Sequence, residues 1–302
     1  MNPSLSPNPI DDLQQLFTYP FMVNALEAGT IVAVLAGLVG WYVVLRRQTF
    51  ASHTLSVMAF PGAAGAALAG LPTALGYYVA CTAAALAIGR GSRTGRPGRA
   101  QGGESAVIGT VQTVGLALGF LFLSLNQAVL GGPETLLFGT FLGITRGQVL
   151  TLALVAVAAL GALAGLARPL LFASVDREVA RASGVPVVLL DGLFLLILGL
   201  AIAATSQLTG ALLVFALLVA PPAAAQRLTA RPLAGLVLTV VLALVTVWLG
   251  LAIAYFSIYP VGFYVSTIAF VVYVLARVIS SRPPHRPPHG PPHRPPHLGR
   301  HH

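Results

Sequence analysis

One histidine stands inside an apolar segment, where an ionisable side chain needs a reason to be. His53 is followed by the polar residues Thr54 and Ser56, and the other six histidines all lie after residue 280. An imidazole can bind a divalent metal ion or exchange a proton near neutral pH. A hydrogen-bonded histidine near a membrane interface explains the residue equally well, so both readings stand at this point.

The same segment is interrupted a little further on by Pro61 and Gly62. A proline removes a backbone donor, so we predict that the helix breaks here within the membrane. Broken helices are tolerated in a bilayer where they line a cavity. Residues 205–227 are a further candidate segment, in which polar residues lie at the outer turn and the span is predicted to end in Pro221–Pro222, before Arg227.

A short charged stretch, FASVDREVARASGVP at residues 172–186, is predicted to form a helix between two apolar segments. Asp176, Arg177 and Glu178 would open it and Gly184 would close it, as helix ends prefer. Its outward charges suit docking to a soluble partner. A solvated loop helix is the alternative.

The C-terminal tail, residues 281–302, repeats the unit Arg/Gly-Pro-Pro-His. Proline-rich repeats adopt polyproline II, which places successive histidines about 12 Å apart, too far to share one metal ion on a straight rod. The tail is therefore predicted either to capture metal weakly or to rest on anionic lipid through its arginines. The candidate ligands are His285, His289, His293, His297, His301 and His302, of which the last two also fit a cloning remnant.

Composition identifies the elements that must position these residues. The chain has 302 residues, of which 56% are hydrophobic and 8% charged, with a mean hydropathy of +0.85. These values predict an all-α integral membrane protein. Every one of the 17 basic residues is arginine, which excludes a P-loop ATPase and lysine Schiff-base chemistry. The single cysteine, Cys81, excludes an internal disulfide and a cysteine zinc site.

Apolar segments of membrane-spanning length predict a bundle of eight or nine helices between residues 19 and 280. A disordered lead, residues 1–18, precedes it, and residues 126–147 are too polar for a clean span and are assigned to a surface or re-entrant helix. The predicted spans are 21–45, 53–70, 72–89, 105–125, 148–167, 187–206, 208–226, 233–255 and 262–279.

The arginines predict the orientation. With the N-terminus outside and the C-terminus in the cytoplasm, only Arg146 falls outside, as the positive-inside rule prefers. The arginines thus act as membrane anchors, and the net charge of +9 does not indicate nucleic-acid binding. The chain is predicted to be a multi-pass protein of the plasma membrane.

Six short patterns, taken in order over residues 20–280, resemble the ABC-3 family of metal-ion ABC importer permeases. They are VVLRR followed by FPG, ESAVIG with Glu104, Ile108 and Gly109 matching, LLFGTFLG, the segment with Asp176, Glu178, Ala180 and Gly184 matching, GALLVFALLVAP, and YPVG. Each is weak alone, and their order and spacing make the resemblance specific.

The resemblance implies a type II importer-like permease that forms a homodimer. It implies a separate ATPase subunit that binds ATP, an extracytoplasmic metal-binding protein, and a cytoplasmic coupling helix at about 174–185. The coupling residues it implies are Asp176, Arg177, Glu178, Ala180 and Gly184. The chain itself would hold no permanent cofactor and catalyse no reaction, and its cargo would be a divalent metal.

One departure from the family pattern concerns the cargo. Where the family has an aspartate and a histidine one helical turn apart, this chain has His53 and Val57. A lone imidazole favours zinc slightly over manganese, so zinc is the predicted cargo. The departure also leaves open a permease of this family with a non-metal cargo.

Two other classes remain as alternatives. A proton-coupled secondary transporter would need acidic or histidine relays, for which only Glu27, His53 and Asp191 are available in or near spans. A receptor or scaffold without transport is disfavoured by the proline-interrupted segments.

Overall fold

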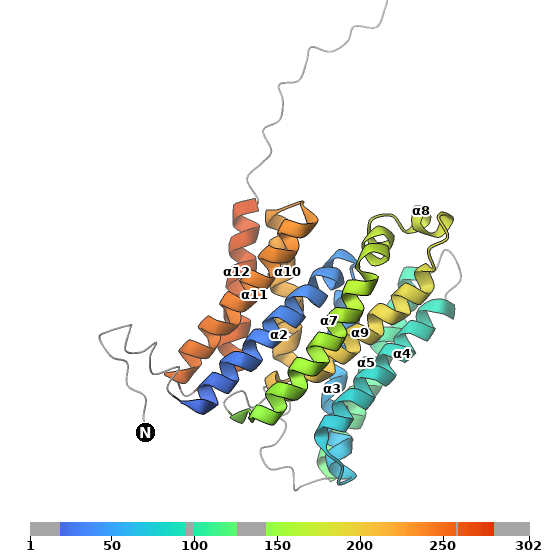
Figure 1. Cartoon of the computed structure of the whole chain (residues 1–302). Helices are drawn as coiled ribbons and strands as arrows, with labels where there is room; N and C mark the ends of the chain where they lie inside the picture. Colours follow the sequence, from blue (N-terminus) through green and yellow to red (C-terminus); the bar gives the residue numbers. More distant parts are fainter. Residues whose placement is uncertain (1–18, 95–99, 126–142, 258, 281–302) are drawn as a thin grey trace, which may run out of the picture.

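The computed structural model describes residues 19–94, 100–125, 143–257 and 259–280, and this part of the chain is a bundle of α-helices (Figure 1). The helices are α2 (Pro20–Leu45), α3 (Thr49–Leu68), α4 (Thr73–Thr94), α5 (Ala100–Leu125), α7 (Arg146–Val175), α8 (Arg177–Ala182), α9 (Val187–Thr209), α10 (Ala211–Leu228), α11 (Pro232–Tyr255) and α12 (Val261–Ser280). No strand occurs in these residues. The all-α membrane fold predicted from composition is confirmed.

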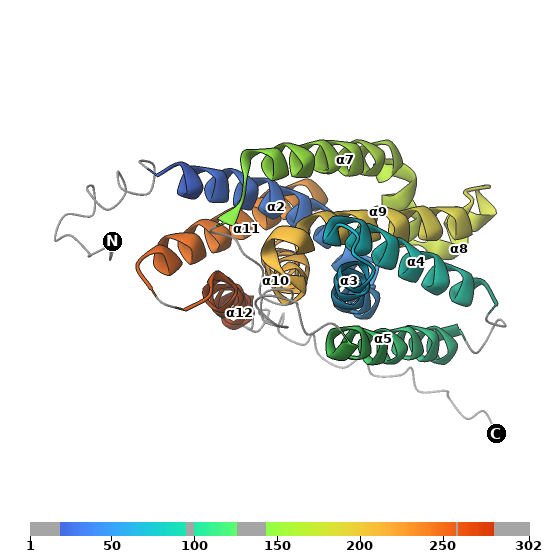
Figure 2. The ribbon, with the colours of Figure 1, turned by 90° about the horizontal axis from the view of Figure 1, so that it is seen from below.

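Six of the described helices are long and apolar enough to cross a membrane by themselves, namely α2, α5, α7, α9, α11 and α12. The apolar part of α10, Leu213–Leu228, is shorter. The helix α3 is mostly buried within the bundle, and it packs against α4, α5, α9 and α10. Figure 2 shows that α12, α10, α3 and α5 follow one another along one side of the molecule.

Glycine pairs let several of these helices touch through their backbones. A Cβ atom on Gly62 of α3 would lie 2.3 Å from the carbonyl oxygen of Gly76 on α4, and one on Gly76 would lie 2.0 Å from that of Gly62. A Cβ on Gly40 of α2 would lie 2.4 Å from the carbonyl oxygen of Leu218 on α10. Such contacts replace the hydrophobic effect, which is weak between helices in lipid.

The predicted helix break at Pro61 and Gly62 is wrong. The helix α3 continues through both residues to Leu68. A proline costs a helix one hydrogen bond, here the one that residue 61 would donate to the Val57 carbonyl, and the surrounding helices hold the segment in place. Gly62 allows the close contact with α4 and does not interrupt α3.

The end predicted at Pro221 and Pro222 is wrong for the same reason, because α10 continues past both prolines to Leu228. The helix α7 likewise extends beyond the predicted span 148–167, through Pro169 to Val175. The turn predicted at Gln207 lies instead at Gly210, whose φ of 77° suits glycine.

Several predictions fall outside the described residues and are untested. These are the N-terminal lead, most of the segment at 126–147, and the tail with all six of its histidines. The side chain of Glu104 also lies outside the described part.

Candidate functional site

His53 lies on α3 beside α10. Its ring meets the Phe215 ring edge to face, with 4.6 Å between the centroids. The side chain is half-buried, and its Nδ1 atom is buried without a hydrogen-bond partner among the described residues. A buried polar atom without a partner is energetically unfavourable. The described contact of the ring is its packing against Phe215, and its Nδ1 atom stays available to a ligand. The alternative of a hydrogen-bonded interfacial histidine is not supported on the Nδ1 side.

One further polar atom on the same helix, the backbone carbonyl oxygen of Val57, lies about one turn beyond His53. Thr49, His53 and Val57 are half-buried and recur every fourth residue, so they share one face of α3. Because residue 61 is proline, the helix supplies no N–H to the carbonyl oxygen of Val57. One imidazole nitrogen and one carbonyl oxygen therefore belong to consecutive turns of α3.

A cavity of about 370 Å³ and one of about 310 Å³ flank α3 and α10, respectively. The first, between α3, α4 and α5, is almost wholly apolar. The second lies between α10 and α12 and shares Phe215 with the His53 contact. Ser266 and Tyr273 are its only lining residues with side-chain polar atoms, so this cavity cannot by itself bind a bare cation.

The described residues contain no group of three or more His, Cys, Asp or Glu side chains that could hold a metal ion together. Within the described residues of one chain, His53 is therefore not part of a closed metal site. A cation at this position would be held loosely, as passage through a membrane requires.

The polar residues predicted at the outer turn of α9 are mostly occupied with their own backbone. The hydroxyl of Thr205 donates to the Ala201 carbonyl at 2.7 Å, that of Thr209 to the Thr205 carbonyl at 2.9 Å, and the amide of Gln207 to the Ala203 carbonyl at 3.2 Å. Ser206 is buried with no partner for its hydroxyl among the described residues. Thr205, Ser206 and Thr209 are thus buried in the bundle, whereas Ala204 and Gln207 line a cavity of about 340 Å³ together with residues of α4 and α7.

The short helix predicted after α7 is present as α8. Asp176 caps its N-terminus, where the carboxylate accepts from the backbone N–H groups of Glu178 at 3.0 Å and Val179 at 2.9 Å. Gly184 has a φ of 82°, which closes the helix, and Ala180 is fully buried beneath it. Glu178 and Arg181 are exposed. The predicted start and end of this helix are confirmed.

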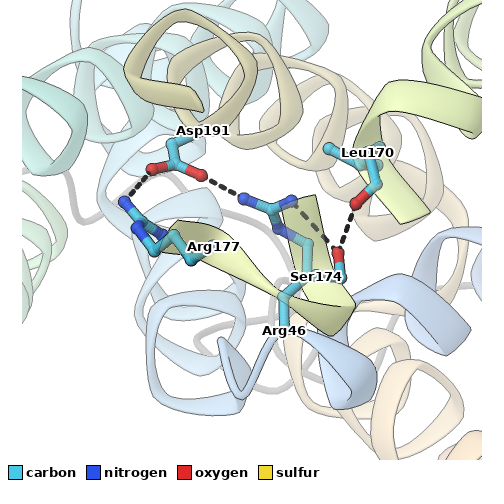
Figure 3. A network of polar contacts seen from close by, with 5 residues as sticks. All are labelled: Arg46, Leu170, Ser174, Arg177 and Asp191. Carbon is cyan, nitrogen blue, oxygen red and sulfur yellow. Dashed lines mark hydrogen bonds and ion pairs between the residues drawn. The ribbon is translucent and has the colours of Figure 1, made fainter. Parts of the chain in front are cut away.

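Arg177 does not point freely outward as predicted. Its guanidinium pairs with Asp191 on α9, and the other oxygen of that carboxylate pairs with Arg46 at the end of α2 (Figure 3). Burial lowers the pKa of Arg46 from its ordinary value, and Asp191 opposes that shift. Sequence reasoning missed this network; the only signal was that an acidic residue so close to a membrane span is rare.

The fold is that of ABC transporter membrane subunits. PsaBC from Streptococcus pneumoniae, solved in complex with a Fab, superposes with a TM-score of 0.77 over 89% of this chain and 95% of that one, at 24% identity. An inward-facing putative metal-chelate type ABC transporter superposes with a TM-score of 0.71 over 91% and 92%, at 18% identity. The sequence profile of the ABC 3 transport family matches residues 18–280, and the chain belongs to this family.

Two relatives illustrate the sequence similarity. The manganese transport system membrane protein MntC of Halalkalibacterium halodurans is 30% identical over 72% of this chain and 73% of its own length. The chelated iron transport system membrane protein YfeC of Yersinia pestis is 30% identical over 83% and 82%. As a member of this family the chain is a multi-pass membrane protein, and the family is that of permease subunits, which are not ATPases themselves.

Proposed function

We propose that this chain is the membrane subunit of an ATP-driven importer for manganese or ferrous iron. The observation that carries the proposal is the half-buried imidazole of His53, whose Nδ1 atom has no partner among the described residues, on the helix that lies between α10 and α5. The relatives support the cargo, because their names assign manganese and iron to them. These relatives are named for manganese and iron, so zinc, the cargo predicted from the sequence, stands as the competing cargo.

The ligand atoms support a hard divalent cation. The carbonyl oxygen of Val57, which has no N–H from residue 61 to accept, is a ligand type that suits manganese, and imidazole suits iron as well as zinc. An ion held by so few protein atoms would keep most of its water. Weak binding of this kind allows the ion both to enter and to leave.

The remaining parts of the importer follow as proposals. The helix α8 would dock in a cleft of the ATPase subunit through Asp176, Glu178 and its exposed side chains. An extracytoplasmic binding protein would deliver the metal at the opposite end, and a second copy of the chain would complete the pathway. The end of the bundle that carries α8 and the C-terminus of α12 would then face the cytoplasm (Figure 1).

The cargo is tested by competition in proteoliposomes that contain the chain with its ATPase subunit and binding protein. Excess unlabelled manganese or ferrous iron should block the ATP-dependent uptake of radioactive manganese. Zinc at the same concentration should reduce this uptake only weakly. Stronger competition by zinc would reassign the cargo to zinc. Uptake that a proton ionophore abolishes while ATP remains would favour the secondary-transporter alternative.

A further inference from the structure

One carboxylate joins three segments at the end of the bundle that carries α8. Asp191 of α9 pairs through one oxygen with Arg46, which ends α2, and through the other with Arg177, the first residue of α8 (Figure 3). Arg46 is 145 residues from Asp191 in the sequence, and Arg177 is 14 residues from it. Between pairs of described residues, these are the two ion pairs of the structure.

The Arg46 side of this cluster is fixed. Its side chain is only 4% exposed. It also donates to the hydroxyl of Ser174 on α7 at 3.3 Å and lies 5.2 Å from the centre of the Phe194 ring. A buried guanidinium of this kind depends on its partner, because an unpaired buried charge is strongly unfavourable. The position of Arg46 therefore follows the position of Asp191.

The Arg177 side of the cluster is exposed at the surface. Its side chain is 50% exposed, and it stands next to Asp176, which caps α8. Any partner that moves α8 must pull on Arg177 or break its pair with Asp191.

Arg46 in turn begins the tight connection to α3. Its backbone N–H binds the Tyr42 carbonyl, and the N–H of Gln48 returns to the Val43 carbonyl at 2.9 Å. Between them, Arg47 has a φ of 57°, a left-handed conformation that leaves this turn little freedom. The helix α3 starts directly after the turn and carries His53 near its beginning.

We propose that Asp191 is a positioning residue that transmits the position of α8 to the α2–α3 turn and so to the His53 end of α3. The inference rests on the proposed function, since it takes α8 as the helix that docks to the ATPase. Two sites count as coupled when both bias one structural element, and here the element is this turn.

The test uses the complete transporter in lipid nanodiscs, with and without a non-hydrolysable ATP analogue on its ATPase subunit. Amide hydrogen exchange is measured for peptides that cover residues 44–56. In the parent complex, the analogue should change exchange in these peptides. In Arg177→Gln, the change should fall to less than a third while the ATPase subunit stays bound. Arg168→Gln is the control, because it removes an exposed arginine near the C-terminal end of α7. This variant should behave as the parent.

Asp191→Asn and the double variant Arg177→Gln with Asp191→Asn complete a double-mutant cycle. The measured quantity is the amount of manganese taken up per ATP hydrolysed. Each single variant should lower this ratio at least fivefold, and the double variant should be no worse than the poorer single one. Effects that multiply, or a normal exchange response in Arg177→Gln, would overturn the inference. If Asp191→Asn does not accumulate, Arg177→Gln decides alone. If the parent moves no manganese yet shows the exchange response, the cargo is wrong and the inference stands.

Discussion

At the scale of single residues, His53 is the side chain on which transport should depend. Replacing it by alanine removes the one imidazole in the described bundle, and we expect metal uptake to fall at least tenfold. The amount of folded protein should stay the same, because the Nδ1 atom makes no hydrogen bond that the change would break. Uptake and membrane content are measured together for the parent and the variant.

The paired variant His53→Asp with Val57→His supplies the control. Both positions lie on one face of α3, so the pair rebuilds a carboxylate and an imidazole one turn apart. We expect this variant to transport and to prefer manganese more strongly than the parent, since a carboxylate is the harder ligand. Parent-level uptake in His53→Ala would instead make His53 a packing residue.

The backbone contribution has its own probe in Pro61→Ala. Alanine restores the N–H that the Val57 carbonyl lacks, so the helix should become more stable while that oxygen is withdrawn from the pathway. Raised thermal stability together with uptake reduced about threefold or more is the expected pair of results. A variant that is more stable and equally active would remove the carbonyl from the proposed ligands.

At the scale of helices, the contact between α3 and α4 depends on glycine. Gly62→Ala would place a methyl group against the Gly76 backbone, and overpacking of this kind costs about 1–3 kcal/mol. The control is Gly161→Ala on α7, where an added Cβ meets nothing within 4 Å. The melting temperature in detergent should fall for the first variant and stay within a degree or two for the second. Equal melting temperatures would mean that the two helices are less closely packed than described.

The same scale shows what the sequence could and could not predict. Hydropathy located the apolar segments because membrane thickness fixes their length. The capped ends of α8 were predictable because Asp176 and Gly184 act within their own turns. The continuity of α3, α7 and α10 through their prolines was not, because neighbouring helices decide whether a proline ends a helix in a membrane. The pairing of Asp191 with Arg46 joins residues far apart in sequence and has no local pattern.

At the scale of the whole molecule, the proposed orientation can be tested with two engineered cysteines in a Cys81→Ser background. Thr145 precedes α7 and Ser183 follows α8, which is joined to the other end of α7. Both residues are exposed, and they lie at opposite ends of the bundle. An impermeant thiol reagent added to intact cells should label Thr145→Cys and spare Ser183→Cys. The reverse pattern would invert the orientation and move α8 away from any cytoplasmic ATPase.

The central claim is that this chain carries a divalent metal across the membrane when its ATPase partner hydrolyses ATP. The most direct measurement is the uptake of radioactive manganese into proteoliposomes that hold the complete complex, with ATP supplied on the α8 side. The account predicts uptake that requires ATP and the binding protein, and that disappears when the ATPase subunit carries an inactivating substitution. Equal manganese and iron accumulation with the active and the inactive ATPase subunit would contradict it.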